Sequence, residues 1–165
     1  MKTQINLFLK ELKHEAEKTR RILACVPEDQ KDWKPHAKSM SLGGLAIHLS
    51  EIPSWLTMTL NTSGLDFSAQ AYTPTPFTST VELLAGFDKG LSEAVERLEK
   101  ATDKELEDIW TMRNGDAVFF SLPKADVLRE WSFNHVVHHR AQLGVYLRLL
   151  NIPLPGTYGP SADTN

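Results

Sequence analysis

Three of the six histidines carry most of the chemical information in this chain. His135 and His139 are four residues apart in a stretch with helical apolar spacing, so their imidazoles project from the same side of a helix. His48 lies in a second such stretch, on the face that points toward the interior of a bundle. Two imidazoles on one helix and one on a facing helix can close a metal site, so these residues are predicted to bind a divalent metal ion.

Four amphipathic stretches supply the helices that would position these histidines. Apolar residues recur every three or four positions, which predicts helices at about 3–26, 41–61, 79–101 and 123–150. Four helices of this length in 165 residues predict an all-α four-helix bundle that forms a single domain. A proline-rich C-terminal tail, residues 151–165, follows the last helix.

Two connections between the helices have informative compositions. Residues 61–78 are rich in Ser, Thr, Pro and Gly, which predicts a long crossover loop between the second and third helices. Asn114 and Gly115 are flanked by Thr111–Arg113 and Val118–Phe120, and this dipeptide is typical of a two-residue hairpin turn. A short β-hairpin is therefore expected between the third and fourth helices.

Composition narrows the cellular setting and the partners. The 18 basic and 21 acidic residues give a formal charge of −3, and no run of Lys or Arg is long enough to follow a phosphate backbone. The N-terminal residues mix charged and apolar types, unlike a signal peptide or a membrane span. We therefore expect a cytoplasmic protein that binds neither nucleic acid nor a membrane. The one cysteine, Cys25, cannot form an internal disulfide.

Three polar residues near the histidines are predicted to support a metal site. Metal-bound imidazoles usually donate their second N–H group to an oxygen, and Glu51 and Gln142 lie within one helical turn of a predicted ligand. His138 points about 100° away from His139 on a helical wheel. It could therefore support the site or face a partner subunit, and a homodimer is one candidate assembly. Glu51 and Gln142 are equally compatible with solvated helix positions.

Residues outside the helices are expected to shape a substrate pocket. His36 follows a proline in the loop before the second helix, from which it could reach the mouth of the site. Tyr158 lies in the tail, whose prolines restrict the backbone and whose apolar residues favour docking on the bundle or a subunit contact.

Several motifs resemble those of the DinB-like, or damage-inducible, four-helix family. Trp33–His36 and Ser39–His48 are similar to its first motif, and Asn134–Leu143 to its second. The tail segment Pro153–Asp163 also fits. Ala141 stands where the family often has Gly, which leaves the three histidines unchanged.

The resemblance implies a metal site and a range of reactions. In that family three histidines hold a divalent metal, and by motif position they correspond here to His48, His135 and His139. The wider superfamily includes transferases that use low-molecular-weight thiols and members described as metal-dependent hydrolases. The motifs are specific for the fold and the metal site but not for one reaction.

The coordination chemistry leaves two classes of function open. Three neutral imidazoles suit Zn, Ni, Fe, Mn or Co and leave a position for water or substrate. A bound water would serve a hydrolase acting on a small molecule, and a bound low-molecular-weight thiol would serve an S-transferase. The alternative is a non-catalytic metal-binding or stress-associated binding protein, because no further nucleophile, acid and base set is evident.

Overall fold

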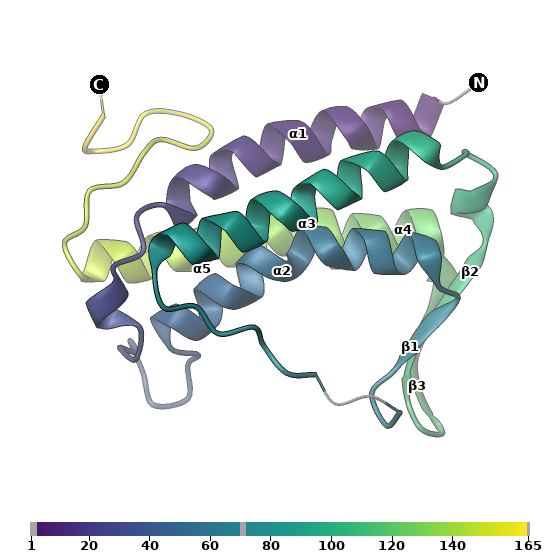
Figure 1. Cartoon of the computed structure of the whole chain (residues 1–165), viewed down its shortest axis with the longest axis horizontal. Coiled ribbons are helices and arrows are strands. Elements are labelled where there is room, and N and C mark those ends of the chain that lie inside the picture. The colour runs from purple at the N-terminus through teal and green to yellow at the C-terminus, as the bar shows by residue number, and fades with distance from the viewer. Residues whose placement is uncertain (1–2, 70–71, 165) are drawn as a thin grey trace.

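Four long helices run side by side along the molecule (Figure 1). The computed structural model describes residues 3–69 and 72–164. The first three helices are α1 (Thr3–Leu23), α2 (Leu42–Asn61) and α3 (Thr80–Lys100). The fourth runs through three consecutive segments, namely α4 (Lys124–Leu128), a π-helical stretch (Arg129–Asn134) and α5 (His135–Leu149). Single 3-10 turns occur at Glu28–Gln30 and Glu105–Glu107.

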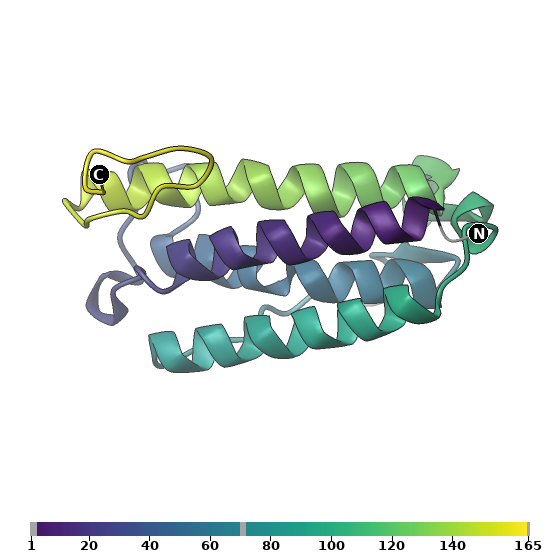
Figure 2. The same ribbon diagram turned by 90° about the horizontal axis from the view of Figure 1, so that it is seen from above.

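The directions of the helices explain the long connection between α2 and α3. The helices α1 and α5 run one way along the bundle, and α2 and α3 run the other way (Figures 1 and 2). Each of α1 and α2 packs against both α3 and α5. Since α2 and α3 are parallel, the chain must return along the bundle between them. The predicted four-helix bundle and its long crossover loop are confirmed.

The bundle has an apolar core of its own. On α2 the side chains of Leu45, Leu49, Ile52 and Leu56 are at most 2% exposed. Each buried side chain of this size stabilises the folded state by roughly 1.5–3 kcal/mol relative to an exposed one. Many such residues, contributed by all four helices, form the two large clusters of the core. This core can therefore hold the histidine-bearing helices together without a bound ion.

Local signals at the helix ends agree with the sequence. The hydroxyl groups of Ser41 and Ser79 accept hydrogen bonds from the backbone N–H groups of Gly44 and Glu82, which caps α2 and α3. After α5, Asn151 adopts a left-handed conformation with φ of 58°, a common way to end a helix.

A small three-stranded sheet lies at one end of the bundle (Figure 1). The strands are β1 (Gly64–Asp66), β2 (Ile109–Asn114) and β3 (Ala117–Pro123). The predicted hairpin is confirmed as the antiparallel pair of β2 and β3, with Gly115 at φ of 59° in the turn. The turn residues are Gly115 and Asp116, one position later than the expected pair, because Asn114 still pairs with Ala117.

One strand was not expected from the sequence. Within the crossover loop, β1 pairs in parallel with β2, and Gly64 lies opposite Thr111. A Cβ atom at Gly64 would come within 2.4 Å of the Thr111 carbonyl oxygen, so the close approach depends on glycine. A three-residue strand has too little periodicity to be recognised, and its partner is distant in the sequence.

No helix in the described part of the chain is both long and apolar enough to cross a membrane.

Candidate metal centre

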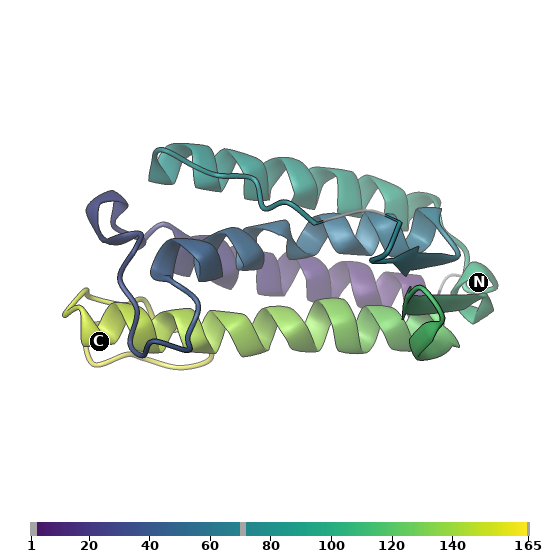
Figure 3. The same ribbon diagram turned by 90° about the horizontal axis from the view of Figure 1, so that it is seen from below.

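Three imidazole rings converge between α2 and α5, which lie side by side (Figure 3). The Nε2 atom of His48 is 3.1 Å from that of His135 and 3.2 Å from that of His139. The Nε2 atoms of His135 and His139 are 2.9 Å apart. All three side chains are half-buried. The structure thus brings together the three histidines that the sequence singled out.

The spacing of the three nitrogens matches that around a transition-metal ion. Such ions bind imidazole nitrogen at about 2.0–2.1 Å, and bond angles of about 90–110° place neighbouring nitrogens about 2.8–3.4 Å apart. The three separations in this chain, 2.9, 3.1 and 3.2 Å, fall within that range. The three histidines could therefore hold one metal ion.

Hydrogen bonding alone does not account for this arrangement. In a neutral imidazole, each ring nitrogen carries either a hydrogen or a lone pair. Among three nitrogens in mutual contact, at least two must be of the same kind, so at least one of the short separations is not a hydrogen bond. A cation that accepts all three lone pairs removes this conflict.

Gln142 orients one of the three rings. Its Oε1 atom lies 2.8 Å from Nδ1 of His139. An amide oxygen accepts a hydrogen bond, so Nδ1 carries the proton and the Nε2 atom of the neutral ring presents its lone pair to the other histidines. This is the arrangement in which a supporting oxygen fixes the ring of a metal ligand.

Burial keeps the three rings neutral. It lowers the pKa of His135 to about 4, and the neighbouring His139 and His48 add to this effect. Burial also lowers the pKa of His48 and of His139, although Gln142 partly opposes the shift at His139. At neutral pH all three imidazole rings are therefore neutral, and each has one nitrogen lone pair that can bind a cation.

An open cleft of about 530 Å³ adjoins His48 and His135. Four further aromatic side chains line it, from α2, the crossover loop and the π-helical stretch: Trp55, Phe67, Tyr72 and Trp131. Met58, Leu65 and Thr73 complete the lining. A cleft of this size and apolar character is typical of a small-molecule site.

The aromatic lining was not predicted from the sequence, although the spacing of two of its residues from the histidines indicated it. Trp55 follows His48 by seven residues and Trp131 precedes His135 by four, so each shares a helix face with a predicted ligand. Trp131 also lies in the π-helical stretch, a feature that often marks functional sites. Phe67 and Tyr72 reach the cleft only through the path of the crossover loop.

The other two residues predicted to support the metal have different surroundings. The carboxylate of Glu51 accepts hydrogen bonds from the Tyr72 hydroxyl and, at 3.0 Å, from the backbone N–H of Thr75. Glu51 therefore fastens the crossover loop to α2. His138 is exposed, and its ring packs edge-on against that of His139 at 4.8 Å between centroids.

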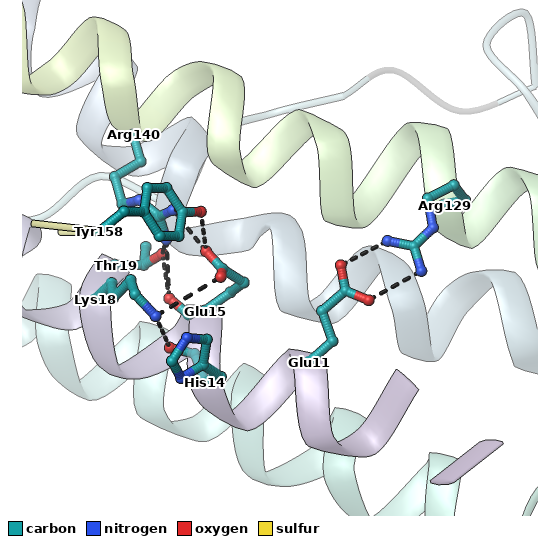
Figure 4. Close-up of polar contacts among 8 residues, drawn as sticks. All are labelled: Glu11, His14, Glu15, Lys18, Thr19, Arg129, Arg140 and Tyr158. Carbon is teal, nitrogen blue, oxygen red and sulfur yellow. Dashed lines mark hydrogen bonds and ion pairs between the residues drawn. The ribbon is translucent and has the colours of Figure 1, made fainter. Parts of the chain in front are cut away.

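The two residues expected to shape the pocket lie away from the cleft. His36 is exposed in the loop before α2, where its Nδ1 atom accepts a hydrogen bond from the backbone N–H of Lys38. Tyr158 lies between α1 and α5, beside Glu15 and Arg140 (Figure 4). Neither residue lines the cleft beside His48. The physical reason is that each belongs to an irregular segment whose path depends on tertiary contacts.

Solved structures of bacterial DinB-like proteins are similar to this chain over nearly its whole length. One from Bacillus cereus has 25% sequence identity and a TM-score of 0.69, covering 92% of this chain and 95% of its own. One from Bacillus subtilis has 16% identity and a TM-score of 0.67, covering 95% and 98%. A protein from Exiguobacterium sibiricum that is described as a member of the DinB family has 21% identity and a TM-score of 0.66, covering 99% of this chain and 98% of its own.

The family model supports the same relationship from the sequence. No curated protein matches the chain. The model of the DinB family matches residues 1–164. Both the expected resemblance and the four-helix bundle are thus confirmed, and the chain belongs to the DinB family.

Proposed function

We propose that this protein is a divalent-metal-dependent enzyme of the hydrolase or thiol S-transferase type. The observation that carries the proposal is the convergence of the Nε2 atoms of three neutral imidazoles beside an apolar cleft. His48, His135 and His139 would hold the ion. When bound, a Zn, Ni, Fe, Mn or Co ion lowers the pKa of a water or thiol that occupies its open position.

The surrounding residues favour thiol transfer over hydrolysis. No Asp, Glu, Lys or Arg lines the cleft among the described residues. The nearby carboxylate of Glu51 already accepts hydrogen bonds through both of its oxygens. Hydrolysis of an ester or amide benefits from a side chain that moves protons to the leaving group. A thiolate that attacks an electrophile has less need of one, so a low-molecular-weight thiol is the proposed cosubstrate.

The chain's own residues would perform three tasks in such a reaction. The histidines fix the position of the nucleophile, and Gln142 keeps the His139 ring in the required tautomer. The apolar walls at Trp55 and Trp131 would contact the electrophile beside the nucleophile.

The test is an activity screen of protein reloaded with each metal in turn. Small thiols with electrophilic acceptors would be assayed beside simple esters and amides. We expect metal-dependent thiol consumption that is lost in His135→Ala and retained in His36→Ala. Turnover of esters alone would instead assign the hydrolase class. Full metal occupancy without turnover in any arm would favour a metal-binding protein without catalysis.

A further inference from the structure

We infer that the aromatic cleft beside the histidines recognises an uncharged aromatic group of the substrate. The inference rests on the proposed function for the position of the reacting atom, and it adds the chemical class of the group held next to it. It begins from the cleft lining, which provides four aromatic side chains and no charged side chain among the described residues. Away from the histidines, a charged group would therefore lose its hydration without a charged side chain to pair with.

The inner wall of the cleft is held in place by ring packing. The Trp55 and Trp131 rings stack with centroids 5.0 Å apart and an angle of 24° between their planes. Trp110 packs behind Trp131 at 5.5 Å, is fully buried, and donates its indole N–H to the Thr62 hydroxyl at 2.9 Å. A wall supported from behind in this way keeps its shape when a ligand binds, which reduces the entropy lost on binding.

The same wall continues to the histidines. The His48 ring meets Trp55 edge-on, with centroids 5.0 Å apart and an interplanar angle of 72°. His135 contacts Trp55 in the same manner at 5.4 Å. A planar group placed against Trp55 therefore lies next to the nitrogens that would hold the ion. Aromatic groups gain from stacked and edge-on contacts of this kind beyond the area that they bury.

The outer rim of the cleft exposes apolar surface that a ligand could cover. Phe67 is 39% exposed and Tyr72 is 53% exposed, and both lie on the crossover loop. Exposed aromatic residues next to a cleft are typical of binding surfaces. An aromatic cage can also attract a cation. Here Trp55 and Trp131 face each other instead of surrounding a space, and an ion at the three histidines would repel a second cation.

The test is a binding titration of the full-length metal-free protein with the uncharged probe N-phenylnaphthylamine. We expect a saturable rise in probe fluorescence at one equivalent, with quenching of tryptophan emission. Phenyltrimethylammonium should compete weakly. Tighter binding of this cation than of an uncharged aromatic compound would overturn the inference.

Two matched charge substitutions locate the bound probe. Phe67→Glu adds a charge at the exposed rim and should weaken binding by about tenfold or more. Val145→Glu adds the same charge at a position on α5 that is 59% exposed and lies in a different cleft, next to the tail, and it should leave the affinity unchanged. If Val145→Glu weakens binding and Phe67→Glu does not, the probe occupies the other cleft and the inference is wrong.

A third variant separates this inference from the proposed function. His139 does not line the cleft, so His139→Ala should lose the metal and any turnover but still bind the probe. Probe binding without metal binding in the unmodified protein would leave the inference standing and reject the proposed function. Turnover of small aliphatic electrophiles without probe binding would support the proposed function and reject the inference.

Discussion

Two polar clusters lie on different sides of the same helix, and they satisfy their polar groups in opposite ways. On the α2 side, His135 and His139 join His48, and all three direct an Nε2 atom to one point. On the α1 side, Arg140 is only 3% exposed, and it donates hydrogen bonds to Glu15 and Tyr158 (Figure 4).

The α1-side cluster is complete within the chain. One terminal nitrogen of Arg140 donates to the Glu15 backbone oxygen and to the Thr19 hydroxyl, both at 3.1 Å. The other lies 2.6 Å from Oε2 of Glu15, which also accepts from the Tyr158 hydroxyl at 2.6 Å. Donors face acceptors and opposite charges meet, so the cluster needs no further ligand.

This difference in hydrogen-bond pairing distinguishes a structural polar cluster from a candidate binding site. The α1-side cluster pairs donors with acceptors, whereas the three half-buried histidines direct their Nε2 atoms toward one another. The histidine cluster gathers three groups of one kind, which is unfavourable unless a cation lies among them. The adjacent residues His139 and Arg140 thus belong to different clusters.

The largest expected effect is the loss of the metal. The protein should bind about one equivalent of a divalent transition metal, and His48→Ala, His135→Ala and His139→Ala should each remove most of it, because two imidazoles hold an ion far more weakly than three. Elemental analysis after reloading measures this, with His36→Ala as the control. Helical circular dichroism should persist in EDTA, since the core does not depend on the ion. Full occupancy in all three variants would show that the site is elsewhere.

The next largest effect concerns stability on the α1 side. Arg140→Leu leaves the buried Glu15 carboxylate without its nearest cationic partner and should lower the free energy of unfolding by about 3–5 kcal/mol. Metal binding should remain near one equivalent. The control is Arg148→Leu, which breaks an exposed pair with Asp163 and should cost about 1 kcal/mol or less. Urea unfolding measures both, and equal losses in the two variants would contradict the structural role of the buried cluster.

The two clusters should also respond to different pH ranges. Because the pKa of His135 is lowered to about 4, the unfolded chain takes up a proton at this group near pH 6.5 while the folded chain does not. The metal-free protein should therefore lose about 2 kcal/mol of stability between pH 7 and pH 5 through this group. His135→Ala should show a correspondingly smaller loss in urea unfolding. An identical pH dependence in both proteins would argue against a buried neutral His135.

The α1-side cluster should respond at lower pH. Burial alone would raise the pKa of Glu15, but hydrogen bonds from Tyr158 and Arg140 bring it below its ordinary value of 4.5. The stability that this carboxylate contributes is present above that value and is lost as the pH falls through the lower pKa of the folded state. Glu15 therefore does not contribute to the loss between pH 7 and pH 5.

A smaller effect on metal affinity is expected from Gln142, which orients the His139 ring. Gln142→Leu removes the oxygen that accepts from Nδ1 of His139 and should weaken metal affinity by about 10–100-fold without removing the site. Gln142→Glu keeps an acceptor oxygen and should retain more of the affinity. Competition titrations with a chelator measure the difference. Equal affinities of Gln142→Leu and the unmodified protein would mean that packing alone orients the ring.

The smallest effect should come from the tail. Tyr158→Phe removes one hydroxyl from the α1-side cluster and should lower the free energy of unfolding by about 0.5–1.5 kcal/mol. Metal affinity should not change, because the tail lies away from the cleft. A change in metal affinity with unchanged stability would show that the two clusters are coupled and would contradict their separate roles.

The features that could be predicted from the sequence depend on residues that are close together along the chain. Apolar spacing, the Ser41 and Ser79 caps and the turn at Gly115 act within a few residues, so the four helices and the hairpin could be predicted. The pair His135 and His139 belongs to this class, because residues four apart on a helix lie on one face.

The contacts between helix faces and loops could not be predicted in this way. The pairing of β1 with β2, the aromatic cleft and the destination of Tyr158 join segments far apart in the sequence. Periodicity shows which side of a helix is buried but not which residue of another element lies opposite it. Long-range packing and the pairing of buried polar groups determine those contacts, and they placed Phe67 and Tyr72 at the cleft while holding Tyr158 beside Arg140.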